Sequence, residues 1–282
     1  MTRARVVVAG ALALIALTGL ACSRSKPRAR ATTSSSSTTT TVPVPTVKTE
    51  QLTGGTTTPY AYDYTVEYPQ LNGMADDNMQ RTINADLTKA ASEFVGDFVA
   101  VVTENPPPTT TSFPSTTTTE APPSASSTTT SLPANRTHLE GKSETTLLDV
   151  RAASFRLQAN GFLSGAAHGF TRFRTLTYDL TTGRRLGLGD LFRSGVDYLG
   201  WLSHESLVQL QARPDIYDPQ TGPAGLTPTE EHFNHFVLTP AGLDIVFDEY
   251  QVGPYAIGTP HVTFPYAQLR PLLATPSPLD GR

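Results

Sequence analysis

Two tracts rich in serine, threonine and proline divide this chain and limit how much of it can form a packed core. Residues 32–41 are ten consecutive serines or threonines, and residues 106–133 form a second tract of similar composition. Only 38% of the 282 residues are hydrophobic, which is low for a globular chain. Such tracts bury too little apolar surface to offset the entropy of ordering the backbone. The sequence therefore predicts that both tracts are disordered.

The N-terminus resembles a bacterial lipoprotein signal. Arg3 and Arg5 precede an uncharged apolar run at 6–20, which ends in small residues followed by Cys22. The run is too short for a membrane-spanning helix and is typical of a signal peptide. We therefore expect residues 1–21 to be removed and Cys22 to carry a lipid anchor that holds the chain at the extracytoplasmic face of the cell membrane. An ordinary secretory signal with an unpaired thiol is the alternative.

The tracts and the signal predict the organisation of the chain. The ordered remainder amounts to 190 residues, enough for one domain with a sizeable core. The 47 residues between the tracts could not bury a core alone, so the second tract is interpreted as a loop inserted in one domain. The predicted segments are a signal peptide at 1–21, a disordered tether at 22–58, a domain at 59–276 with a disordered insertion at 106–133, and a tail at 277–282.

The distribution of charge argues against nucleic acid as a partner. The first 30 residues hold six of the 21 lysines and arginines and no acid, so the remainder has 15 basic and 25 acidic residues. An acidic surface attracts cationic partners and repels nucleic acid. The sequence also lacks a phosphate-binding loop, a dinucleotide fingerprint and a nucleophile elbow. No cofactor and no metal site are expected.

Hydrophobic periodicity predicts an α+β fold, with a mostly antiparallel sheet and two to three helices. Residues alternate from Tyr60 to Tyr68, which is typical of a strand, and Pro69 is expected to end it. Asp76 precedes apolar residues spaced by threes and fours as far as Val101, which predicts an amphipathic helix. Further strands are expected at 145–150, 153–162, 170–179, 184–188, 236–239, 243–247 and 261–264, and further helices at 196–211, from 227, and at 265–273.

Several short motifs occur in an order that resembles a known family. They are Tyr-Pro-Gln-Leu-Asn-Gly at 68–73, Ser-Gly-Ala-Ala-His-Gly at 164–169, Leu-Gly-Asp-Leu-Phe at 188–192 and Asp-Glu-Tyr-Gln-Val-Gly-Pro-Tyr-Ala-Ile-Gly at 248–258. Together they resemble the extracytoplasmic domain of unknown function shared by RsiV-type anti-sigma factors, PdaC-type peptidoglycan deacetylases and some secreted mycobacterial antigens. In the RsiV type this domain binds lysozyme, and in the PdaC type a separate metal-binding domain performs the deacetylation. The resemblance therefore implies a non-catalytic binding role.

The second and fourth motifs supply the candidate binding residues. Their glycines and prolines are typical of shaped loops, and such loops often carry recognition side chains. We expect these loops to bind a protein such as lysozyme or a cell-wall ligand, although setting strained turns is an alternative role. The candidates are His168, Asp248, Glu249, Tyr250 and Tyr255.

Other interpretations remain open from the residues alone. A cell-wall hydrolase could use His168 as a general base with a carboxylate at 248–249. A structural lipoprotein would bind no small ligand. The alternating tyrosines at 60–64 could form a sugar-stacking face or could pack on a helix. His232 and His235 are spaced for one helical face, but a zinc site needs at least a third ligand.

Overall fold

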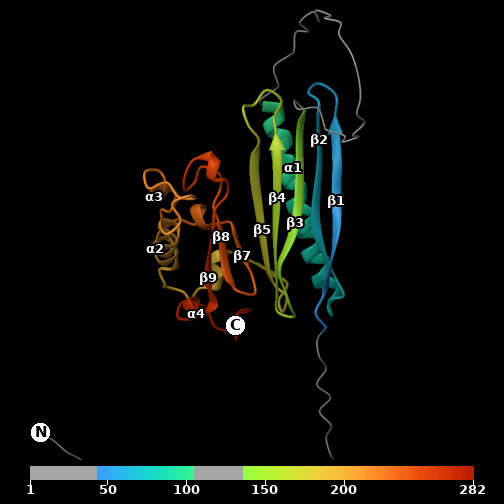
Figure 1. Ribbon diagram of the computed structural model, residues 1–282. Helices are drawn as coiled ribbons and strands as arrows, with labels where there is room; N and C mark the ends of the chain where they lie inside the picture. Colours follow the sequence, from blue (N-terminus) through green and yellow to red (C-terminus); the bar gives the residue numbers. More distant parts are fainter. Residues whose placement is uncertain (1–42, 105–135) are drawn as a thin grey trace, which may run out of the picture. The chain divides into compact units, whose positions relative to one another are not determined.

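The computed structural model describes residues 43–104 and 136–282 (Figure 1). The predicted signal peptide at 1–21, Cys22 and the predicted insertion at 106–133 lie outside the described residues. Within the described ranges, no helix combines the length and the apolar character needed to cross a membrane.

Two sheets and four α-helices make up the described chain (Figure 1). The larger sheet contains, in spatial order, β1 (Thr46–Thr56), β2 (Tyr62–Asn72), β3 (Thr137–Leu148), β4 (Ala152–Phe162), β5 (Phe170–Asp179) and β6 (Arg184–Leu186). The smaller contains β7 (Phe236–Leu238), β8 (Gly242–Val246) and β9 (His261–Pro265). The helices are α1 (Asp77–Glu104), α2 (Tyr198–Gln211), α3 (Gly222–Gly225) and α4 (Tyr266–Leu269). All paired strands are antiparallel except β2 and β3, so the predicted α+β class is confirmed.

The amphipathic helix predicted after Asp76 is α1, which packs on the larger sheet. The carboxylate of Asp76 accepts hydrogen bonds from the backbone N–H groups of Asn78 and Met79, at 2.8 and 3.0 Å, and so caps the helix. One face of α1 is buried against alternate residues of β4, among them Phe155 and Leu157. The buried residues of α1 are Ile83, Leu87, Ala90, Ala91, Phe94, Val95, Phe98 and Val102.

The alternating tyrosines of β2 pack toward α1. The rings of Tyr62 and Phe98 meet edge to face, with centroids 5.9 Å apart, and Tyr60, Tyr64 and Tyr68 pack against the same core. These contacts favour the packing role over the sugar-stacking face considered for these residues.

The predicted tether is wrong over its last part, because β1 lies within 22–58. β1 pairs with β2 along all 11 of its residues, and Val47 and Leu52 pack against the core. With so few apolar side chains, this strand has no periodicity strong enough to reveal it, and the pairing itself stabilises it.

Pro69 does not end β2, which continues to Asn72. β3 pairs with β2 only as far as Val66, so Pro69 lies where the β3 ladder has already ended. The missing N–H of a proline is tolerated where no neighbouring strand requires it.

Three further boundaries differ from the prediction. β3 begins at Thr137 rather than 145, because its polar side chains hide the alternation. The helix expected from Thr227 is only a 3₁₀ turn at Glu231–Phe233, since the Thr227 hydroxyl donates to the carbonyl of Ala224 and does not cap a following helix. The helix expected at 265–273 is confined to α4.

The predicted tail at 277–282 is part of the packed structure. Leu279 is buried, with 2% of its surface exposed, and the Arg282 guanidinium forms an ion pair with Asp149. Burial opposes ionisation of Asp149, but hydrogen bonds from the N–H groups of Arg151 and Ala152, together with Arg282, outweigh it and lower the pKa of Asp149.

A buried hydroxyl joins the two sheets. Ser154 of β4 accepts a hydrogen bond from the N–H of Leu238 in β7 at 2.9 Å, and its oxygen lies 2.8 Å from the hydroxyl of Thr177 in β5. Ser154 and Thr177 are both buried. The sheets are therefore coupled by a polar contact in which all three groups are satisfied.

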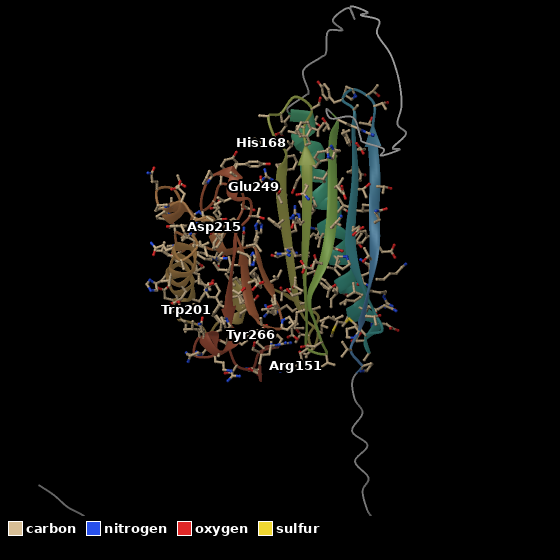
Figure 2. The ribbon with its side chains drawn as sticks, viewed as in Figure 1. Arg151, His168, Trp201, Asp215, Glu249 and Tyr266 are labelled. Atoms are coloured by element: carbon tan, nitrogen blue, oxygen red, sulfur yellow. The ribbon has the colours of Figure 1, made fainter. Side chains whose placement is uncertain are left out.

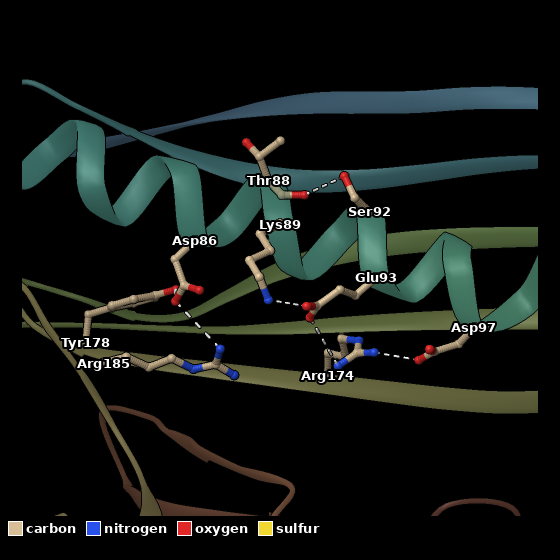
Figure 3. A network of polar contacts seen from close by, with 9 residues as sticks. All are labelled: Asp86, Thr88, Lys89, Ser92, Glu93, Asp97, Arg174, Tyr178 and Arg185. Carbon is tan, nitrogen blue, oxygen red and sulfur yellow. Dashed lines mark hydrogen bonds and ion pairs between the residues drawn. The ribbon is translucent and has the colours of Figure 1, made fainter.

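Polar contacts along one side of α1 attach it to β5 and to the start of β6 (Figure 3). The Tyr178 hydroxyl donates to Asp86 at 2.8 Å, and Arg185 lies 3.6 Å from the same carboxylate. Burial and the Asp86 contact raise the pKa of Tyr178, so its hydroxyl keeps its proton. Further along the helix, Arg174 donates to Asp97 at 2.5 Å.

Candidate functional site

The fold brings together three of the five candidate residues. His168 lies on the loop between β4 and β5, and Tyr250 and Tyr255 lie on the segment that follows β8. The His168 ring stacks on Tyr255 with centroids 4.1 Å apart and planes inclined by 30°. Tyr250 lies 6.4 Å from His168 and 5.7 Å from Tyr255, measured between centroids. We call these three residues the aromatic trio.

The two nitrogens of His168 are both engaged. Nδ1 lies 2.7 Å from the carbonyl oxygen of Gly169, which can only accept, so Nδ1 carries the proton in the neutral ring. Nε2 then accepts from the Tyr250 hydroxyl, 3.2 Å away. A general base needs a free nitrogen lone pair, and here that lone pair is used to hold Tyr250.

Tyr250 has a backbone conformation that is unfavourable for its residue type. Its φ is +67°, and no other non-glycine residue within 43–104 and 136–282 has a positive φ. Its side chain is nevertheless 56% exposed. A strained residue persists only where its surroundings impose the conformation, and such residues cluster at functional sites.

Gln251, the next residue, anchors this segment through its side chain. Its side-chain oxygen accepts from the N–H of Asp248 at 2.9 Å, and its amide nitrogen donates to the carbonyls of Gly225 and His232, both at 2.9 Å. Sequence reasoning included Gln251 in a motif but gave it no role, because its partners are 19 and 26 residues away in the chain.

The two candidate acids do not join His168. The Asp248 carboxylate lies 3.3 Å from Nδ1 of His235. Burial opposes ionisation of Asp248, but the hydrogen bond from His235 and the positive charge of Arg172 outweigh it and lower the pKa of Asp248. Glu249 lies on the loop after β8 (Figure 2), and in the described part of the chain its carboxylate has no hydrogen bond or ion pair.

A cavity of about 450 Å³ adjoins the loops that carry the trio. Leu163 and Phe170, on either side of the 165–169 loop, line it, and so does Asp248 at the start of the other loop. Most of the remaining wall is apolar and comes from α1, β3 and β5. These wall residues are Phe94, Phe98, Val101, Leu139 and Phe173.

Charged side chains also line this cavity. Asp97 pairs with Arg174 and Asp248 pairs with His235. Arg172 has its guanidinium 5.5 Å from the centroid of the Phe170 ring. Among the described residues it has no side-chain hydrogen bond and no ion pair, so its positive charge is not neutralised by direct contact.

The two histidines spaced for a metal site are separated in the structure. Nδ1 of His232 lies 3.0 Å from the carbonyl of Thr227, whereas His235 contacts Asp248. Residues 43–104 and 136–282 contain no group of three or more histidine, cysteine, aspartate or glutamate side chains placed to hold a metal ion.

The segment 189–267 matches the family model described as "Protein of unknown function (DUF3298)". The predicted resemblance to a PdaC-associated family is thereby confirmed. The DUF3298 segment contains Asp248, Glu249, Tyr250 and Tyr255, whereas His168 reaches the trio from the β4–β5 loop outside it.

The proteins similar to this chain include one curated relative and two solved structures. The chain is 30% identical over 110 residues to the peptidoglycan-N-acetylmuramic acid deacetylase PdaC of Bacillus subtilis; this match covers 39% of the chain and 24% of PdaC, about a quarter of the relative's length. A crystal structure of a DUF3298 family member from Bacteroides fragilis matches with a TM-score of 0.54 and 20% identity, covering 82% of this chain and 94% of that one. A DUF3298 family protein from Pseudomonas aeruginosa matches with a TM-score of 0.49 and 15% identity, covering 84% and 98%. The Bacteroides fragilis structure shows the same fold.

Proposed function

We propose that this protein is a non-catalytic binding domain of the cell envelope that recognises cell-wall glycan through the aromatic trio. The observation that carries the proposal is the set of three rings on two loops, with Tyr250 exposed and held in a strained conformation. Aromatic rings offer large, rigid and amphipathic faces, and tyrosine loses little conformational entropy when it binds. Sugar rings present apolar C–H groups that pack on such faces.

The relative supports a cell-wall ligand. PdaC is named for its action on the N-acetylmuramic acid of peptidoglycan, and part of this chain is similar to part of it. A lipid anchor at Cys22 would hold the domain at the membrane, beside that polymer.

The geometry gives less support to the alternative of a hydrolase. His168 would have to release Tyr250 before it could accept a proton, and Asp248 is held by His235 rather than by His168. Neither interaction prepares a general base beside a carboxylate.

A cationic protein such as lysozyme is the second candidate ligand. The observation that favours it is the excess of acidic residues beyond residue 30, with 25 acids against 15 bases. Complementary charge accelerates association and depends strongly on salt. Tyrosine is also enriched among the residues that dominate protein interfaces.

Calorimetric titration of the full chain in detergent tests the proposal. Chitooligosaccharides, muropeptides and lysozyme are the probes. We expect saturable binding of the glycans, and a loss of at least tenfold in affinity for Tyr255→Ala and for Tyr250→Ala. Val208→Ala, an exposed apolar residue on α2, is the matched control and should bind as wild type does. Binding of lysozyme alone would replace the first candidate by the second, and binding of none of the probes would remove both.

The anchor needs a separate experiment. Cells that express the chain are supplied with labelled palmitate, and the protein is then fractionated. We expect label and membrane association for wild type and neither for Cys22→Ala. An unlabelled wild-type protein would contradict the anchor and leave the binding proposal to stand on the trio.

A further inference from the structure

We infer that the cavity beside the aromatic trio accepts a carboxylate-bearing N-acetylated sugar, of the muramic acid type, and that Arg172 recognises its carboxylate. This inference rests on the proposed function and deepens it, because it names the sugar class that the site selects. A neutral sugar would use the trio alone.

The cavity has the size and the walls for such a ligand. Its volume of about 450 Å³ lies in the range of small-molecule sites, which is about 300–1,000 Å³. Phe94, Phe98, Leu163 and Phe170 form an apolar wall. The methyl groups of an N-acetyl substituent and of a lactyl ether can pack there, where burial of apolar surface favours binding.

The charges of the cavity select an anion. Each of its carboxylates already has a cationic or hydrogen-bonding partner, Arg174 for Asp97 and His235 for Asp248. Arg172 is the remaining guanidinium: it lies over the face of Phe170 and its charge attracts Asp248, but in the described ranges its side chain has no hydrogen bond or ion pair. A guanidinium can donate two parallel hydrogen bonds to one carboxylate, which makes it a selective partner for that group.

The cavity adjoins both of the loops that carry the trio. Phe170 follows His168 by two residues, and Asp248 precedes Tyr250 by two. One ligand can therefore stack on the trio with one sugar and place a substituent of the adjoining sugar in the cavity.

A larger hollow elsewhere is a weaker candidate. It measures about 610 Å³ and is bordered by Arg185, Asp190 and Glu230. Asp190 accepts from Arg184 and from the N–H of Gly187, Glu230 accepts from the Tyr198 hydroxyl, and Arg185 pairs with Asp86. Its charged groups are thus engaged in hydrogen bonds or ion pairs within the protein.

The test compares two disaccharides on the full chain in detergent. One is N-acetylglucosaminyl-N-acetylmuramic acid with a free lactyl carboxylate, and the other is chitobiose, which has no carboxylate. We expect wild type to bind the acidic sugar about tenfold more tightly, with a preference that shrinks as salt is added. Arg172→Gln should bind both sugars equally, at the affinity of chitobiose, whereas Arg172→Lys should keep part of the preference. Arg156→Gln, which removes an ion pair with Glu144 on the same sheet, is the control and should keep all of it.

Removing acids near the cavity should raise the affinity for the acidic sugar, in contrast to the loss expected for Arg172→Gln. Arg174 pairs with both Asp97 and Glu93, so the double variant Asp97→Asn, Glu93→Gln removes both acids and leaves a second guanidinium available at the cavity. We expect it to strengthen binding of the acidic sugar several-fold and to leave chitobiose unchanged. A loss of folding could not mimic a gain in affinity for one sugar only.

The outcomes separate the two proposals. If Tyr255→Ala loses both sugars but Arg172→Gln retains the wild-type preference, the role of Arg172 is wrong and the proposed function stands. Equal affinity of wild type for the two sugars also overturns the inference alone. If wild type binds neither sugar, the proposed glycan function fails and the inference fails with it.

Discussion

The two sheets of this protein are built in different ways. The strands β1–β5 are 10–12 residues long and α1 has 28 residues, whereas the strands of the smaller sheet have only three to five. In the larger sheet the core comes from regular alternation, as in the buried Phe155 and Leu157 of β4. Around the smaller sheet much of the core comes from loops and turns, such as Phe233, Phe247 and Val252.

This difference shows how the candidate site is divided between scaffold and loops. Long regular elements position the cavity wall, and the irregular part supplies Tyr250 and Tyr255. Recognition residues are common on loops that a rigid scaffold holds in place. The site forms only if the two parts keep their relative position, and the first two predictions test how firmly they are coupled.

The largest loss of stability is expected from a substitution in the core of the larger sheet. Phe155 is fully buried, so Phe155→Ala should lower the free energy of unfolding by about 3–5 kcal/mol. Trp201, the only tryptophan, lies in α2 against Phe264 and reports on the other part of the molecule. Urea unfolding is measured with two probes, Trp201 fluorescence and circular dichroism. We expect the two midpoints to fall by the same amount.

The control for this variant is Val208→Ala on the exposed face of α2, which should change stability by less than about 0.5 kcal/mol. In Phe155→Ala, the midpoint from Trp201 fluorescence could stay at its wild-type value while the midpoint from circular dichroism falls. The two parts would then unfold independently and would be two separate domains.

The second effect concerns the hydroxyl between the sheets. Ser154→Ala leaves the N–H of Leu238 and the hydroxyl of Thr177 without this buried partner, which should cost about 1–3 kcal/mol. Ser143→Ala on neighbouring β3 removes a hydroxyl that has no hydrogen-bond partner in the described chain, and should be nearly neutral. Equal urea midpoints for the two variants would show that the hydrogen bonds of Ser154 do not stabilise the contact between the two sheets.

The third prediction concerns stability and the backbone strain at Tyr250, in the segment after β8. Tyr250→Gly and Tyr250→Ala remove the same ring, but only glycine adopts a positive φ without strain. We therefore expect Tyr250→Gly to be more stable than Tyr250→Ala by about 1 kcal/mol in thermal or urea unfolding, while both lose glycan binding. Identical stabilities would mean that the loop relaxes in the variants and that residue 250 no longer keeps a positive φ.

The smallest effect is a change in acid sensitivity. The pKa of Asp149 is lowered in the folded state, so its carboxylate stabilises the protein above its ordinary pKa near 3.8 and loses that effect as the pH falls below it. Asp149→Asn should be less stable than wild type at pH 7, and the difference between them should narrow at pH 3. A difference that widened on acidification would contradict the lowered pKa.

Much of the larger sheet could be predicted from the sequence, because local patterns determine it. The apolar spacing of α1 and the alternation along β4 and β5 indicated these elements nearly to their ends. β1 could not be predicted, since its stability depends on pairing with β2 and not on its own residues. The 3₁₀ turn after Thr227 was mistaken for a helix because the Thr227 side chain turns back to Ala224, a contact that no motif reveals.

The sequence by itself determined the composition of the tracts, the class of the fold and the two loops in which the candidate residues lie. Only the tertiary structure decided which of those residues meet. It stacked His168 on Tyr255 across 87 positions of the chain and paired Asp248 with His235 instead of His168. The physical reason is that periodicity and turn chemistry act between near neighbours, whereas contacts between distant loops depend on how the whole core packs.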